Sequence, residues 1–267
     1  MRQKNDTKYR RKNDAKKALQ QIRPVSSETK KAARLRWDQV AKPLNSLGIL
    51  EEDLVRIAGA QNSEAVCLDQ KWIAVMCADN GIVEEGVTQT GQEVTAVVAA
   101  NMARGASCVC LMAAKAGAKV LPVDVGIASD MEGTGILNRK IRYGTRNFLK
   151  EPAMTREETV KAMETGMEAA GILKEKGCRL AGCGEMGIGN TTTSSAVLSV
   201  LLGKEPEEVT GRGAGLSDEA LNRIGGMAYV FIRGYSGKTP PEIPPSILLK
   251  PDASLVRLAD TLLFGED

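Results

Sequence analysis

Short apolar runs alternate with longer amphipathic segments along most of this chain. Apolar runs bounded by glycine, asparagine or aspartate are typical of buried strands, whereas apolar residues at three- and four-residue spacing are typical of helices. The clearest helix follows Thr155, because Thr155 and Glu158 match a capping box and Gly177 stands where the helix can end. In chain order the pattern predicts a strand at 71–77, helices at 92–103 and 106–116, a strand at 118–124, the helix after Thr155, a strand at 178–182 and a helix at about 192–202.

This alternation of strands and helices predicts an α/β fold. We expect a parallel sheet flanked by helices on both faces, doubly wound and Rossmann-like, with a small N-terminal helical part. Ligands in such folds bind at the carboxyl ends of the strands. Asp79, Asp124 and Glu185 follow or end the three predicted strands. These carboxylates are therefore the first candidates for a functional site.

The sequence contains no histidine. Its absence excludes Ser-His-Asp and Cys-His nucleophile pairs and histidine-ligated metal sites. Any chemistry must use carboxylates, amides, hydroxyls and backbone N–H groups, and we expect neither a metal nor another cofactor. With no C-x-x-C pair and no secretory signal, the cysteines are interpreted as small buried residues of a cytoplasmic protein. They are Cys67, Cys77, Cys108, Cys110, Cys178 and Cys183.

Charge and aromatic content limit the partners that we expect. Residues 1–36 carry 13 Lys and Arg against 3 Asp and Glu, so the basic character of the chain belongs to this arm. Aromatic residues make up only 3% of the chain, so we interpret the arm as solvated and do not expect nucleic-acid binding. The longest apolar stretches are interrupted by Arg104, Lys115 and Lys119. They are shorter than the ~18 apolar residues that a membrane-spanning helix needs.

Two glycine-rich turns, at 182–191 and 210–215, are candidates for ligand binding. The stretch 182–187 fits the dinucleotide fingerprint G-x-G-x-x-G, but the predicted helix starts later than that motif requires. The turns fit better as cradles for a ribose and a phosphate at a helix N-terminus. Two tight strand-to-helix turns with ordinary caps would give the same pattern. Glu185 is a candidate proton acceptor or donor.

Several ordered motifs resemble the nicotinate-nucleotide:dimethylbenzimidazole phosphoribosyltransferases of cobalamin biosynthesis. The family implies transfer of phosphoribose from nicotinate mononucleotide to 5,6-dimethylbenzimidazole, giving α-ribazole 5′-phosphate and nicotinate, without a cofactor and in a homodimer. The resemblance extends over roughly residues 34–223. It is carried by residues 78–90, 92–96, 123–127, 184–192 and 209–215, and by Lys42-Pro-Leu-Asn-Ser-Leu-Gly48.

The resemblance also implies roles for individual residues, with Glu185 as the carboxylate of the active site. Val98 stands where some relatives have glutamine, and Asn80 where many have histidine, so the pocket is expected to favour a different or plainer base. The benzimidazole pocket would include Thr90, Val98 and Met186. Ribose and phosphate would be held by Gly187, Gly189, Asn190, Thr191, Gly213 and Gly215. Asp79 and Asp124 are further substrate-binding candidates because of their positions at the strand ends.

The resemblance stops near Ile224, where the family has a lysine that reaches the phosphate. We therefore expect a basic arm at 1–36, an α/β domain at 37–223 and a divergent tail at 224–267, which holds five of the ten prolines. A frameshift near codon 224 or a divergent module would explain this tail. Because the family's principal catalytic base lies in the later part, little transferase activity is expected. A binding remnant without catalysis is the alternative.

Overall fold

The computed structural model describes residue 20 and residues 22–211 of the chain. These residues fall into two compact units, one up to Asp69 and one from Gln70 onward. The expected tail at 224–267 lies outside the described residues.

The first unit is built on two packed helices, α2 (Ser27–Asp38) and α3 (Ile49–Gln61). Ser26 is the N-cap of α2, and its side chain accepts a hydrogen bond from the backbone N–H of Thr29 at 3.1 Å. The boundary expected after residue 36 lies inside this helix. The core of the unit consists of Ala33, Val55 and Ala58, with Trp37 and Val66 packed against them.

The link between α2 and α3 is the Lys42–Gly48 motif, and a buried ion pair holds it. The Lys42 ammonium lies 2.8 Å from the Glu51 carboxylate, whose side chain is 1% exposed. The same carboxylate accepts the backbone N–H of Leu47 at 3.0 Å. Gly48 precedes α3 with φ of +57°, a conformation that favours glycine.

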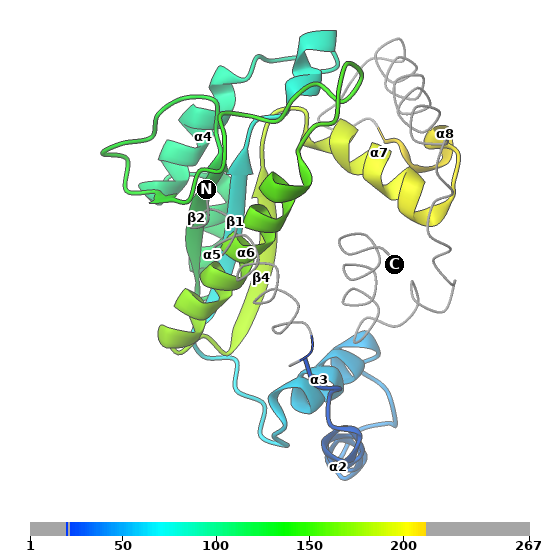
Figure 1. Cartoon of the computed structure of the whole chain (residues 1–267). Helices are drawn as coiled ribbons and strands as arrows, with labels where there is room; N and C mark the ends of the chain where they lie inside the picture. Colours follow the sequence, from blue (N-terminus) through cyan, green and yellow to red (C-terminus); the bar gives the residue numbers. More distant parts are fainter. Residues whose placement is uncertain (1–19, 21, 212–267) are drawn as a thin grey trace, which may run out of the picture. The chain divides into compact units, whose positions relative to one another are not determined.

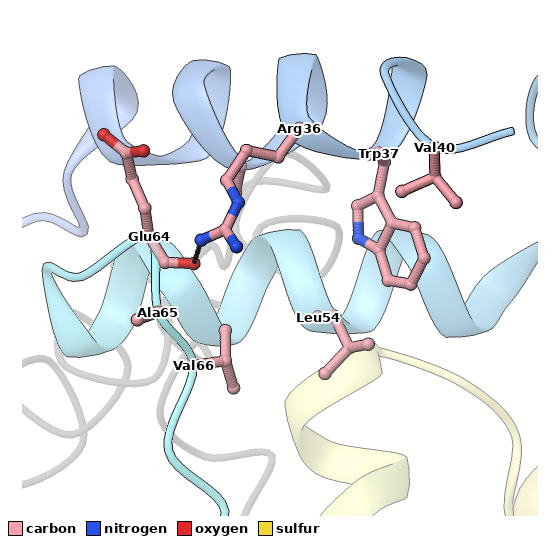
Figure 2. Close-up of a pocket in the computed structure, with 8 residues that line it drawn as sticks. Arg36, Trp37, Val40, Leu54, Glu64, Ala65 and Val66 are labelled. Atoms are coloured by element: carbon pink, nitrogen blue, oxygen red, sulfur yellow. Dashed lines mark hydrogen bonds between the residues drawn. The ribbon is translucent and has the colours of Figure 1, made fainter.

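A groove of about 420 Å³ runs between α2, α3 and the segment after α3. In Figure 2 the side chains of Trp37 and Leu54 line it, and the Arg36 guanidinium donates to the carbonyl oxygen of Glu64 at 3.3 Å. The residues that line the groove are Ala33, Arg36, Trp37, Val40, Leu54, Glu64, Ala65 and Val66. None of the predicted site residues is among them.

The second unit contains a four-stranded sheet in the order β3-β2-β1-β4, with every neighbouring pair parallel. This confirms the predicted parallel α/β architecture. Lys71 of β1 pairs with Ala118 of β2 and with Leu180 of β4, so these three strands start level and end at the same edge. The strands are β1 (Lys71–Ala78), β2 (Ala118–Gly126), β3 (Leu137–Asn138) and β4 (Leu180–Met186).

Helices cover both faces of the sheet. α4 (Glu93–Ala103) and α5 (Cys108–Lys115) pack on β1 and β2 through a shared apolar cluster that includes Val75 and Cys77. α6 (Arg156–Glu175) crosses the other face, in front of the strands in Figure 1. The other helices among the described residues of this unit are η1 (Gly81–Glu85), α7 (Asn190–Leu202) and α8 (Pro206–Val209).

Local signals placed two of the helix boundaries correctly. Thr155 caps α6 by accepting the Glu158 backbone N–H at 3.2 Å, and the Glu158 carboxylate accepts the Thr155 N–H at 2.7 Å. Gly105 separates α4 from α5 with φ of +74°. Residues Glu93–Lys115 are long and apolar enough to span a membrane by length and composition alone. In the structure they form these two helices, which pack on the sheet.

The glycine-rich stretch after residue 180 differs from the prediction. β4 continues to Met186, so Gly182, Gly184 and Glu185 belong to a strand and only Gly187–Gly189 form the loop. Backbone pairing with β1 outweighs the low strand propensity of glycine here. The cysteine prediction was also wrong in part, because Cys77 and Cys110 are buried whereas Cys108 and Cys183 are exposed.

Candidate active site at the strand ends

Asp124, near the end of β2, is fully buried and bonded within the protein. Its Oδ1 accepts the backbone N–H groups of Gly126 at 3.1 Å and Ile127 at 2.9 Å. Its Oδ2 lies 3.3 Å from the Lys140 ammonium, which also donates to the Ile127 carbonyl at 2.7 Å. These contacts fix the connection that leaves β2. Asp124 therefore supports the strand end in this structure and offers no exposed oxygen to a ligand.

Asp79, directly after β1, is also buried, at 1% exposure. Its carboxylate accepts the backbone N–H of Ala128 at 2.8 Å. Burial raises the pKa of Asp79, while a hydrogen bond from the Thr95 hydroxyl and the Ala128 amide act in the opposite direction. Asp79 thus ties the end of β1 to the connection after β2.

Glu185 differs from both aspartates because it is exposed. Its two carboxylate oxygens accept from the Asn190 side-chain amide at 2.7 and 2.6 Å. Asn190 is the first residue of α7, so this contact joins the end of β4 to the start of the next helix. The structure therefore brings together two predicted site residues, Glu185 and Asn190.

The strand register separates the two carboxylates that end β2 and β4. Cys77 pairs with Asp124 and Met186, whereas Met76 pairs with Val123 and Glu185. Successive side chains on a strand point to opposite faces, so Glu185 and Asp124 lie on opposite faces of the sheet. The three carboxylates share one edge, as predicted, but they do not converge on one point.

Gly187 and Gly189 are required by close packing. A Cβ at Gly187 would lie 1.8 Å from the carbonyl oxygen of Ala78, so no larger residue fits the present backbone. Gly189 has φ of +87°, and a Cβ there would lie 2.9 Å from Cγ2 of Val83. Because both residues lack a side chain, the loop can pack closely against the end of β1 and against η1.

Several backbone N–H groups around this loop already have acceptors within the protein. The Ile188 N–H donates to Thr95 Oγ1 at 3.0 Å, and the Asn190 N–H to the Gly187 carbonyl at 3.0 Å. The Thr191 N–H donates to Asn190 Oδ1 at 2.8 Å. A ligand at this loop would therefore meet the exposed residues Glu185 and Thr191 more readily than these three amides.

The residues predicted to line the benzimidazole pocket lie in two different environments, one apolar and one exposed. Val98 of α4 and Met186 of β4 are both half-buried and pack against the same apolar cluster. Thr90 lies in an exposed loop, where its carbonyl accepts from the Thr88 hydroxyl at 2.8 Å. Gly213 and Gly215 lie outside the described residues. No cluster of three or more metal-ligating side chains occurs in the part of the chain that the structure describes.

The sequence motifs did not reveal that two side chains, those of Asn80 and Thr95, hold the loop after β4. Asn80 donates from Nδ2 to the Ile188 carbonyl at 3.2 Å, and Thr95 accepts the Ile188 N–H. Both residues lie in stretches that resemble the family, at 78–90 and 92–96, and this resemblance was the one indication in the sequence that they matter. Their partners are far away in sequence, so no local pattern could have identified the contacts.

Comparison with known proteins gives consistent matches. The model of a phosphoribosyltransferase family matches residues 22–224. The nicotinate-nucleotide–dimethylbenzimidazole phosphoribosyltransferase of Ruminiclostridium cellulolyticum is 48% identical over 208 residues, which cover 78% of this chain and 59% of the relative. The protein of the same name from Alkaliphilus metalliredigens is 45% identical over 212 residues, covering 79% and 61% respectively. The chain thus spans less than two thirds of these curated relatives.

The fold has solved counterparts. CobT from Thermus thermophilus is 40% identical with a TM-score of 0.74, and the match covers 77% of this chain and 62% of that chain. A second structure from this organism, described as the dimethylbenzimidazole phosphoribosyltransferase, is 35% identical with a TM-score of 0.74, covering 88% and 69%. The family match over residues 22–224 includes the sheet and the strand-end residues described above.

Proposed function

Since the chain belongs to the phosphoribosyltransferase family that includes these dimethylbenzimidazole enzymes, we propose that it acts on nicotinate mononucleotide and a benzimidazole at the strand ends. The proposed reaction transfers phosphoribose from nicotinate mononucleotide to 5,6-dimethylbenzimidazole or a related base. Its products are α-ribazole 5′-phosphate and nicotinate. The observation that carries this proposal is the exposed Glu185 carboxylate, which Asn190 orients at the start of α7.

The chemistry suits the groups at this edge. A benzimidazole nitrogen forms a bond to C1 of the ribose as the bond from C1 to the pyridinium nitrogen breaks. The benzimidazole N–H proton passes to a carboxylate, the role that we assign to Glu185. The pyridinium already carries positive charge, so its departure as neutral nicotinate nitrogen needs no metal ion. The N-terminus of α7 provides a dipole that favours the substrate phosphate.

The base would be accommodated at the carboxyl-end edge of the sheet, next to the strand end that carries Glu185 on one face and Met186 on the other. Val98 and Met186 supply apolar surface there, and Thr90 supplies a polar group on the exposed loop. Because Val98 offers no hydrogen-bonding group, we expect a base that needs no polar contact at this position. Gly187, Gly189, Asn190 and Thr191 would adjoin the ribose and phosphate. A homodimer and a cytoplasmic location complete the proposal.

Binding without turnover is the second candidate function. It is favoured by one observation, namely that Asp79 and Asp124 are buried and bonded within the protein, so that of the three strand-end carboxylates Glu185 is the exposed one. In this alternative the loop after β4 would bind a nucleotide without transferring its phosphoribosyl group.

Two measurements on the purified full chain test these alternatives. Calorimetry with nicotinate mononucleotide and with dimethylbenzimidazole measures binding, and chromatographic detection of α-ribazole 5′-phosphate measures transfer. If transfer occurs, Glu185→Gln should lower it by about 10²-fold or more, as expected for loss of a proton acceptor. Glu157→Gln, on the exposed first turn of α6, is the matched control and should leave transfer unchanged. Binding without product supports the second candidate, and no binding of either compound refutes both.

A further inference from the structure

The peptide group of Ile188, in the loop between β4 and α7, is held on both sides by distant side chains. Its N–H donates to Thr95 Oγ1 at 3.0 Å, and its carbonyl oxygen accepts from Asn80 Nδ2 at 3.2 Å. Thr95 lies 93 positions earlier in the chain and Asn80 lies 108 positions earlier. The loop is therefore fixed by the first turn of α4 and by the end of β1.

Both side chains are themselves held in place. Thr95 is fully buried, in the first turn of α4. Asn80 is 9% exposed, and its Oδ1 accepts the Thr193 hydroxyl of α7 at 2.9 Å. The orientation of each side chain is thus set before any ligand arrives.

The loop needs such contacts because glycines flank Ile188. Gly187 and Gly189 give the Ile188 peptide more rotational freedom than other residues would, and Gly189 has a positive φ. Hydrogen bonds to both sides of the peptide remove this freedom in the folded protein. A loop that is ordered beforehand loses less conformational entropy when it binds a ligand.

We propose that Thr95 and Asn80 are positioning residues, which fix the Gly187–Asn190 loop in the conformation that receives the phosphoribosyl group. This inference rests on the proposed function, because it assumes that the nucleotide binds at this loop. Neither residue is assigned a contact with substrate. They act through the Ile188 peptide, which in turn sets the position of Asn190 and of the Glu185 carboxylate bonded to it.

The variants are chosen to change one contact at a time. Thr95→Val keeps the shape of the side chain but removes the acceptor for the Ile188 N–H, and Thr95→Ser keeps the hydroxyl. Thr165→Val is the matched control, because Thr165 is a buried helical threonine of α6 whose hydroxyl donates to the Lys161 carbonyl at 3.0 Å, within its own helix. Asn80→Ala removes the opposite contact and replaces Thr95→Val in the test if that variant does not fold.

Two readouts on the full chain separate positioning from general stability. Amide hydrogen exchange at Ile188 should become at least tenfold faster in Thr95→Val, and calorimetry should show about tenfold weaker binding of nicotinate mononucleotide. Thr95→Ser should restore both values to within about threefold of the parent chain. Thr165→Val should lower the thermal midpoint without changing either value.

Three results would overturn the proposal, and they are distinguishable. Unchanged exchange at Ile188 in Thr95→Val would show that the contact does not hold the loop. Faster exchange with unchanged affinity would show that the loop conformation does not govern binding. A parent chain that binds no nicotinate mononucleotide would refute the proposed function itself, together with the positioning role that depends on it.

Discussion

Gly187→Ala should destabilise the protein, because the loop after β4 lies against the backbone of β1. The added Cβ would stand 1.8 Å from the Ala78 carbonyl oxygen and 3.1 Å from Nδ2 of Asn80. Carbon and oxygen atoms make close contact at about 3.3 Å, so the loop and strand would have to separate by about 1.5 Å. Gly187 is not among the glycines with positive φ, so the cost arises from the clash and not from backbone conformation.

The expected loss of stability is about 3 kcal/mol, the upper part of the usual range for overpacking. Both clashing partners are constrained, because Ala78 pairs with Gly126 in the sheet and the Gly187 carbonyl accepts the Asn190 N–H at 3.0 Å. For a protein of this size, about 3 kcal/mol corresponds to a fall in thermal midpoint of about 6–12 °C. The shift should also displace the Asn80 amide from the Ile188 carbonyl, and so weaken nucleotide binding if the proposed function is correct.

Differential scanning calorimetry of the full chain measures this effect, with Gly171→Ala as the matched control. Gly171 lies within α6 and is exposed, and apart from its chain neighbours and the adjacent backbone of its own helix, no atom lies within 4 Å of the position that an added methyl carbon would take. Alanine there should stabilise the helix by about 0.5–1 kcal/mol. The two alanine variants should therefore shift the midpoint in opposite directions. A Gly187→Ala protein with an unchanged midpoint would refute the packing argument for this loop.

Two further predictions concern buried and partly buried charges. Lys140→Met should lower the unfolding free energy by about 3 kcal/mol in urea titrations, since it leaves the buried Asp124 carboxylate without its cation; a change below about 1 kcal/mol would contradict this. The Arg146 guanidinium and the Thr155 N–H lower the pKa of Glu158 to about 2, below its usual 4.5. The stabilisation by Glu158 is thus complete above about pH 4.5 and is lost as the pH falls toward 2. Glu158→Gln should flatten this part of the acid-unfolding curve, whereas Glu157→Gln should not.

The main elements of the second unit were predictable because their signals are local. The capping box at Thr155 and the glycine at Gly105 set helix boundaries through contacts within a few residues. The apolar runs of β1 and β2 likewise reflect burial on both faces of a parallel sheet. The extent of β4 was not predictable, because its glycines disfavour a strand until β1 supplies the paired backbone.

The sequence predicted which residues lie near the candidate site, but it did not predict the role of each one. Asp79, Asp124 and Glu185 do lie at one edge of the sheet, as the order of strands and helices implied. Their different roles depend on burial and on the alternation of side chains along each strand. Asp79 and Asp124 accept backbone amides and stabilise loops, whereas Glu185 remains exposed beside Asn190.

By itself, the sequence determined the parallel α/β fold, the family and the residues that can take part in chemistry, because periodicity, capping and motif order are properties of neighbouring residues. Only the tertiary structure decided that Thr95 and Asn80 hold the peptide of Ile188, and that Gly187 must be glycine. Those contacts join residues separated by about a hundred positions. They arise when parallel pairing brings the ends of β1 and β4 to the same edge, and no shorter-range pattern can specify that arrangement.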